Sequence, residues 1–173
     1  ARDFIQLGEQ LDIRVECAIT YGGQPVGRAI GPALESIEAV SILEGAKAPN
    51  SVLEKTVSIC GMLFEMGGDY QGQGGNPDLK SSDISIGQYS VDVIAKQTGY
   101  VGQIMNKALV RVARTAGSPK DKGAGLVISK KVGNKVDKGE TIFTIYAEHE
   151  WKLQEALKLA IRLEPIRLQG MVL

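Results

Sequence analysis

The chain has 173 residues, of which 43% are hydrophobic and 23% charged, and its 20 basic residues balance 20 acidic ones. A chain of this size and composition can bury a core and form one domain or two small ones. The zero net charge and the 5% of aromatic residues argue against nucleic acid or an anionic membrane as a partner.

Two cysteines, Cys17 and Cys60, lie inside apolar patterns and form neither a CxxC motif nor a metal-ligand spacing. We expect both to be buried free thiols in a reducing compartment. The first residues contain no apolar run long enough for a signal peptide, and no stretch approaches the length of a membrane span. The sequence therefore predicts a soluble cytoplasmic protein.

The first part of the chain is predicted to be mainly helical with one strand. Residues 3–10 are typical of the last turns of a helix that begins upstream. The alternating apolar residues from Ile13 to Ile19 predict a strand with one buried face. A glycine-rich loop follows, and Pro32 opens a helix that stops near Gly45, because its missing N–H would have no partner there. Another helix is expected from about residue 50 to the Gly67-Gly68 pair.

The composition changes between residues 69 and 85, where Gly, Gln, Asn, Asp, Pro and Ser predominate, as in a linker. Beyond it the pattern predicts a compact α+β unit. We expect strands at residues 89–94, after Gly99, at Leu126–Ile128, within VGNKVDKGETIFTIYA and at IRLQGMVL, and helices at residues 108–116 and 150–163.

No stretch carries a complete catalytic motif. The glycine-rich loop matches neither GxGxxG nor GxxxxGK[ST], so its spacing favours a structural turn over a nucleotide cradle. His149 is the single histidine and lies among acids at a helix start, where we expect a surface or capping role. Its neighbours Glu148 and Glu150 suit the helix dipole better than a metal ion. Lys120 and Lys122 could hold an anion, although a polar loop is the simpler interpretation.

The segment VGNKVDKGETIFTI resembles the hairpin of biotinyl and lipoyl carrier domains. A carrier needs an exposed lysine on a tight turn soon after the second strand of this hairpin. Here that place is YAEHEW, and the next lysine, Lys152, falls within a predicted helix. We therefore expect the fold of the hairpin without carrier chemistry, and a non-catalytic binding or assembly module is one hypothesis for the chain.

Three stretches together resemble one enzyme family. ITYGGQPVGRAIGPALESIEAV is similar to the segment SDMxQPLGxxxGNALEVxEA of thymidine and pyrimidine-nucleoside phosphorylases. The sequence from TGYVGQIMNK to IYAEHE resembles their C-terminal domain, with its GYV start, its VGxxVxKGxxLxxIHA hairpin and its closing helix. The YGGQP variant and the LEPIRLQGMVL ending are most similar to the AMP phosphorylase branch.

The resemblance implies an α+β protein that represents the C-terminal portion of such an enzyme. Residues 1–68 would be the remnant of a mixed α/β domain, residues 69–85 a linker, and residues 86–173 an α/β-hammerhead-like C-terminal domain. The implied enzyme is a pentosyltransferase that converts AMP and phosphate to adenine and ribose 1,5-bisphosphate. Thymidine or pyrimidine nucleosides are the alternative substrates.

The implied site must hold phosphate, the co-substrate, and stabilise the departing base. The phosphate-cradling loop and the base-contacting arginine, serine and lysine of the family lie upstream of the matched part. The resemblance therefore implies no catalytic and no substrate-binding residue in this chain, and no activity of the chain alone. It also implies a homo-oligomer without an organic cofactor. A family segment of a few dozen residues before QGGNPDL is represented here only by residues 69–73.

One functional feature is carried by the matched stretches. Pyrimidine-nucleoside phosphorylases hold a monovalent cation with two backbone carbonyls of the QPLGxx segment and a glutamate on the following helix. The corresponding positions are Val26, Ala29 and Glu38. Carbonyl and carboxylate oxygens are suitable ligands for a hard cation such as potassium. A solvated Glu38 without a bound cation is the alternative.

Overall fold

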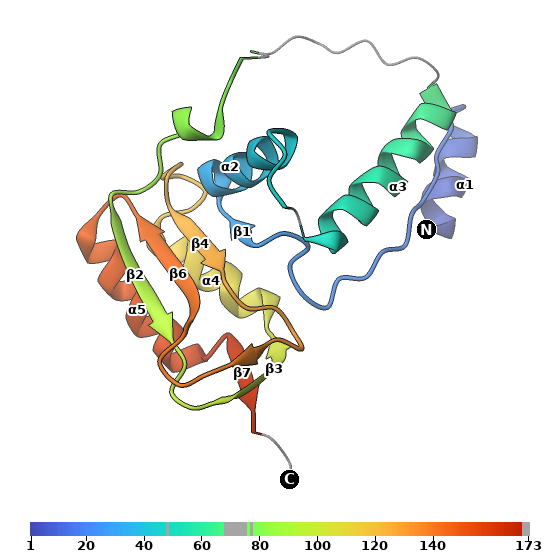
Figure 1. Cartoon of the computed structure of the whole chain (residues 1–173). Coiled ribbons are helices and arrows are strands. Elements are labelled where there is room, and N and C mark those ends of the chain that lie inside the picture. Colours follow the sequence, from blue (N-terminus) through green and yellow to red (C-terminus); the bar gives the residue numbers. More distant parts are fainter. Residues whose placement is uncertain (48, 68–75, 77, 171–173) are drawn as a thin grey trace. The chain divides into compact units, whose positions relative to one another are not determined.

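The computed structural model describes residues 1–47, 49–67, 76 and 78–170 (Figure 1). These residues pack as two units, one from Ala1–Gly22 and Ala48–Pro77 and the other from Gly23–Lys47 and Asp78–Leu173. From Gly23 onward, the glycine-rich loop therefore packs with the C-terminal residues, although it precedes the predicted linker. The predicted domain limits at residues 68 and 85 stay a prediction, and residues 69–75 and 77 of that linker lie outside the described residues.

The larger unit contains a four-stranded antiparallel sheet in the order β1-β4-β6-β2. Ile145 of β6 lies opposite Leu126 on one side and opposite Val91 on the other. The inner position of β6 explains why TIFTIYA is largely apolar, since most of its side chains are buried. The strands are β1 (Ala29–Ile30), β2 (Tyr89–Ile94), β4 (Gly125–Ile128) and β6 (Thr141–Ala147).

A second antiparallel sheet of the same unit has the order β5-β3-β7. Its middle strand, β3 (Gly99–Ile104), pairs with β5 (Lys135–Val136) and with β7 (Ile166–Gln169). Val101 is buried and lies opposite Leu168. This pairing connects the hairpin region to the last described residues of the chain.

Two amphipathic helices complete the core of the larger unit. Helix α4 (Asn106–Ala116) packs on α5 (Glu150–Leu163), and both contact β6. Their inward residues recur at helical spacing, as expected for a helix with one buried face. The buried helical residues are Leu109, Val112, Ala113 and Ala116 on α4 and Leu153, Ala156 and Ala160 on α5, and they join Phe143 and Ile145 of β6 in one cluster.

Helix α2 (Pro32–Leu43) begins directly after β1, with Pro32 in its first turn as predicted. Gly31 precedes it with a φ of 130°, a backbone conformation that residues with a side chain rarely adopt. A Cβ atom at Gly31 would fall on the carbonyl oxygen of Ala124 and 3.0 Å from the Cα of Gly125. Gly31 is therefore required both by its backbone angle and by the close approach of β4.

The far end of α2 is connected to a short 3₁₀ helix, η1 (Ser81–Asp83). The carboxylate of Glu44 accepts the Ser81 N–H at 3.1 Å and the Ser81 hydroxyl at 2.5 Å. These hydrogen bonds fix the start of the described segment that leads into β2.

The smaller unit contains helices α1 (Arg2–Gln10) and α3 (Asn50–Gly67). Gly8 is the buried residue of α1, and no residue of α3 is buried. The strand predicted from Ile13 to Ile19 is wrong, because these residues have no hydrogen-bonded strand partner in the described part of the chain. The expectation of two buried thiols is also wrong, since Cys17 is half-buried and Cys60 lies on the uncovered α3.

The predicted helices after Pro32, from residue 50 and at residues 108–116 and 150–163 are confirmed, and so is the α+β class. Among the helices of the described residues, none combines the length and the apolar character needed to cross a lipid bilayer.

Candidate functional site

The segment from Gln24 to Ile30 lies along the chain that follows β4. The side-chain carbonyl of Gln24 accepts the Val132 N–H at 3.1 Å. The Arg28 guanidinium donates to the Ser129 carbonyl at 2.6 Å, and the Arg28 carbonyl accepts the Ile128 N–H at 2.8 Å. Backbone and side-chain hydrogen bonds therefore hold the glycine-rich loop against residues 128–132.

The side chain of Lys131 contacts three successive carbonyl groups of the loop. Its Nζ lies 2.5 Å from the carbonyl oxygen of Pro25 and 3.4 Å from that of Val26, and it also contacts the carbonyl oxygen of Gly27. An ammonium group has three donors, which matches three converging carbonyls. The backbone N–H of Lys131 donates to Oδ1 of Asn134 at 2.8 Å.

Glu38 of α2 holds the other side of the loop. Its Oε1 accepts the Arg28 N–H at 2.8 Å, and its Oε2 accepts the Ala29 N–H at 3.2 Å. A Cβ atom at Gly27 would overlap this carboxylate. Glycine at position 27 is thus what allows the carboxylate to reach the backbone of the loop.

Burial and two neighbouring charges shift the pKa of Lys131. Burial lowers the pKa of Lys131 below its ordinary value, because burial penalises the charged form. The negative charge of Glu38 opposes this shift, and the positive charge of Arg28 adds to it. The ammonium and the carboxylate therefore stabilise each other across the loop.

The structure brings two residues of the predicted cation site into contact, through the N–H of Ala29 and not its carbonyl, and places the third against Lys131. The Val26 carbonyl faces Lys131, while Ala29 and Glu38 are joined by a hydrogen bond. Sequence reasoning did not single out Lys131, which lies 104 to 106 residues from its carbonyl partners. The only feature of the local sequence that could have indicated Lys131 is the Lys130-Lys131 pair before the turn at Gly133.

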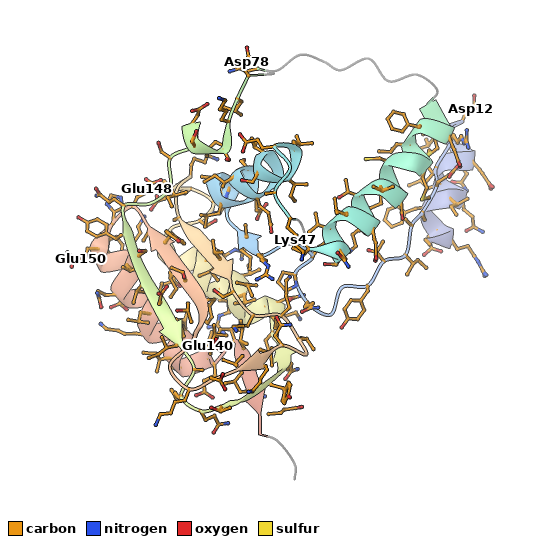
Figure 2. All side chains as sticks on the ribbon, in the orientation of Figure 1. Asp12, Lys47, Asp78, Glu140, Glu148 and Glu150 are labelled. Atoms are coloured by element: carbon orange, nitrogen blue, oxygen red, sulfur yellow. The ribbon has the colours of Figure 1, made fainter. Side chains whose placement is uncertain are left out.

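The two acids beside His149 lie next to the start of α5. His149 is the N-cap of α5 without a side-chain capping hydrogen bond. Glu148 accepts the Gly123 N–H at 2.8 Å, and Glu150 lies in the first turn of α5 (Figure 2). Within the described residues, no group of three or more His, Cys, Asp or Glu side chains is arranged to hold a metal ion.

Lys152 forms an ion pair with Asp121 and does not lie exposed on a turn. Its Nζ lies 2.5 Å from Oδ2 of Asp121, and both side chains are largely buried. The hydrogen bond from Lys152 holds the pKa of Asp121 below its usual value, although burial acts in the opposite direction. A carrier domain requires an exposed lysine on a tight turn, and Lys152 lies in α5 instead.

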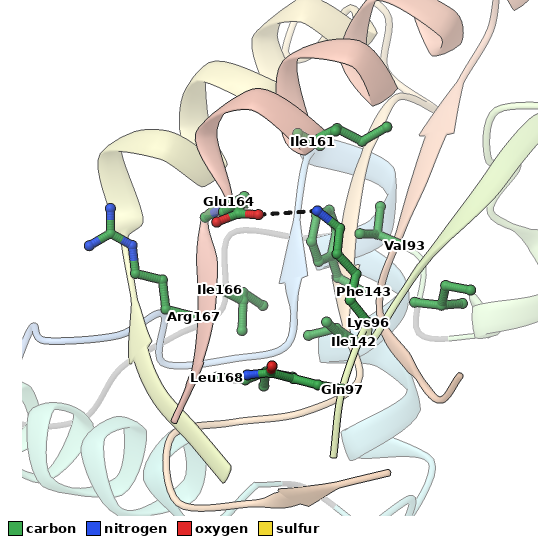
Figure 3. Close-up of a pocket in the computed structure, with 13 residues that line it drawn as sticks. Val93, Lys96, Gln97, Ile142, Phe143, Ile161, Glu164, Ile166, Arg167 and Leu168 are labelled. Atoms are coloured by element: carbon green, nitrogen blue, oxygen red, sulfur yellow. Dashed lines mark hydrogen bonds and ion pairs between the residues drawn. The ribbon is translucent and has the colours of Figure 1, made fainter. Parts of the chain in front are cut away.

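A cavity of about 400 Å³ opens between β2, the end of α5 and β7 (Figure 3). Apolar side chains such as Phe143 and Ile166 line it. At its rim, Lys96 and Glu164 form an exposed ion pair with an N–O distance of 3.2 Å. Exposed pairs of this kind contribute little to stability, roughly 0–1 kcal/mol. Besides this ion pair, the lining contains two further polar residues, Gln97 and Arg167.

Comparison with known proteins finds similarity to one group of phosphorylases. Residues 100–166 match the family described as pyrimidine nucleoside phosphorylase C-terminal domain. The whole chain is 45% identical to the AMP phosphorylases of Methanosarcina acetivorans, Thermococcus kodakarensis and Pyrococcus furiosus. Residues 100–166 are therefore similar to the C-terminal domain of pyrimidine nucleoside phosphorylases, and the chain along its whole length is similar to AMP phosphorylases.

The chain spans 39% of the Methanosarcina acetivorans relative and 40% of the Thermococcus kodakarensis relative, and it corresponds to a C-terminal portion. These alignments extend over 199 positions against the 173 residues of the chain, a difference of 26. The phosphorylase relatives thus carry positions that this chain lacks. Both Lys131 and the Asp121–Lys152 pair lie inside the matched C-terminal domain, whereas the loop from Gln24 to Ile30 precedes it.

Proposed function

We propose that this chain is part of an AMP phosphorylase, a pentosyltransferase that cleaves AMP with phosphate. The observation that carries the proposal is the 45% identity to AMP phosphorylases along the entire chain. The YGGQP and LEPIRLQGMVL stretches, which resemble this branch, also support it. The alternative is a thymidine or pyrimidine-nucleoside phosphorylase.

In the proposed reaction, an oxygen of phosphate forms a bond to the anomeric carbon of ribose while the bond to adenine breaks. The products are ribose 1,5-bisphosphate and adenine, and the base takes up a proton as it leaves. Such a site needs donors for phosphate and a proton source or hydrogen bond for the base. We expect those groups in the part of the relatives that this chain does not span.

The described residues favour a framework role for this portion. The loop from Gln24 to Ile30 is held by Glu38, Lys131 and the chain after β4 rather than left open to a substrate. We therefore expect the 173 residues alone to lack phosphorolysis activity. The rigid loop would support a phosphate site supplied by other residues of the longer protein.

A potassium ion at Val26, Ala29 and Glu38 stays an untested prediction for the longer enzyme, and a positive charge supplied by the protein itself is the alternative to it. Converging carbonyls beside a carboxylate support a positive charge at this loop. A homo-oligomer in the cytoplasm that acts on small-molecule nucleotides, without an organic cofactor, is the corresponding expectation for the whole protein. Light scattering of the purified protein measures its oligomeric state.

The test compares the natural gene product with the 173-residue chain. We expect phosphate-dependent release of adenine from AMP by the natural protein and none by the chain alone. Uridine in place of AMP is the matched substrate control, and a preference for uridine would favour the pyrimidine-nucleoside alternative. Activity of the 173 residues alone would contradict the framework role. A natural protein whose intact mass equals that of this chain would favour the assembly module.

A further inference from the structure

The loop carbonyls of Pro25, Val26 and Gly27 converge on one point, and the ammonium of Lys131 occupies that point. Successive carbonyl oxygens carry partial negative charges, so a positive group between them stabilises their convergence. A free metal cation and a lysine side chain are two ways to supply that group. In this chain the lysine is in place.

The two occupants would compete for the same acceptor groups. The Val26 carbonyl belongs to the predicted cation site and is also 3.4 Å from Lys131 Nζ. The two carboxylate oxygens of Glu38 already accept the N–H groups of Arg28 and Ala29. A free cation at the Val26 carbonyl would therefore lie beside an ammonium of the same charge.

We infer that Lys131 is the cation of the glycine-rich loop, a positioning residue whose tethered ammonium replaces a free monovalent ion. The ammonium is covalently attached, so it orders the loop without depending on the potassium concentration. It also joins the loop before α2 to the hairpin of the C-terminal domain. The inference rests on contacts within this chain and is independent of the reaction proposed for the longer enzyme.

The matched pair of variants is Lys131→Met and Lys130→Met in the full 173-residue chain. Both remove one positive charge from adjacent positions, but Lys130 pairs with Glu140 at 3.2 Å and does not contact the loop. Thermal unfolding is measured in potassium chloride and in choline chloride at equal ionic strength. Choline is too large to enter a carbonyl cluster.

We expect the midpoint of the wild-type chain to be the same in both salts. Lys131→Met should lower the midpoint in choline by roughly 5 °C, and potassium should restore at least half of this loss. Lys130→Met should show no difference between potassium and choline. Stability of Lys131→Met equal to that of Lys130→Met in both salts would overturn the inference.

A second measurement needs only the wild-type chain and remains decisive if Lys131→Met does not fold. Thallium(I), a potassium mimic, is titrated and followed by its own NMR signal. We expect no saturable thallium site in the wild-type chain. Saturable binding to the wild-type chain that Glu38→Gln abolishes would overturn the inference, because the loop would then hold a free cation despite Lys131.

Discussion

The N–H of Arg28 donates to both carboxylate oxygens of Glu38, at 2.8 Å to Oε1 and 3.1 Å to Oε2. Glu38 lies ten residues later, on α2, so this contact folds the loop back onto the helix that it opens. The carboxylate thereby satisfies backbone donors ahead of the helix, where negative charge is favoured.

Glu38→Ala should destabilise the larger unit by about 1–2 kcal/mol, because the N–H groups of Arg28 and Ala29 lose their charged acceptor. Urea unfolding monitored by circular dichroism measures the change. Glu54→Ala, the same substitution on the exposed surface of α3, is the control and should change stability by less than about 0.5 kcal/mol. Equal effects of the two substitutions would show that the loop does not depend on the carboxylate.

Gly27→Ala should displace the Glu38 carboxylate, since the added Cβ would lie 3.0 Å from its carboxyl carbon and overlap one oxygen. We expect a loss of about 1–2 kcal/mol, comparable to that of Glu38→Ala. In the double variant the two losses should not add, because both remove the same contact. Gly22→Ala is the control, since a Cβ atom there would meet no neighbour within 4 Å. Additive losses at Gly27 and Glu38 would contradict this mechanism.

The local sequence pattern was sufficient to predict an element that contains its own start and stop residues. Helix α5 was predicted from Glu150 to Leu163 and is found there, because its apolar spacing is regular and Pro165 follows it. Pro32 marked the start of α2 in the same way. These elements depend on residues close to one another in the chain.

Pattern failed where a partner distant in sequence decides the structure. Residues 13–19 alternate as a strand should, but a strand also needs a neighbour, and in the described residues none pairs with them. Ala29 and Ile30 form a strand because Val127 and Leu126 pair with them. Lys131 was missed for the same reason, since only the fold brings it to the carbonyl of Pro25.

The Asp121–Lys152 pair should make stability sensitive to acid. The pKa of Asp121 is lowered in the folded chain, so the unfolded chain binds the proton more readily. The contribution of Asp121 is present above about pH 4, the ordinary aspartate pKa, and is lost as the pH falls through its lower folded value. Urea midpoints measured from pH 6 to pH 3 should fall less steeply for Asp121→Asn than for the wild-type chain.

Lys152→Met is the matched control for the acid sensitivity, because it removes the main cause of the pKa shift and leaves Asp121 in place. The two single variants and the double variant form a cycle that isolates the coupling between the side chains. An unchanged pH dependence in Lys152→Met would mean that another group causes the acid sensitivity.

Helix α3 has 18 residues and helix α4 has 11. We nevertheless expect the backbone amides of the two helices to differ in their rates of hydrogen exchange. Isolated helices are marginal in water, so protection depends on burial rather than on length. Four residues of α4 are buried and none of α3 is, and the amides of α3 should therefore exchange at least about 100-fold faster. Exchange read by mass spectrometry on peptides from both helices of the same sample provides an internal control. Equal protection that disappears on dilution would instead show that self-association covers the exposed face of Leu53, Val57 and Phe64.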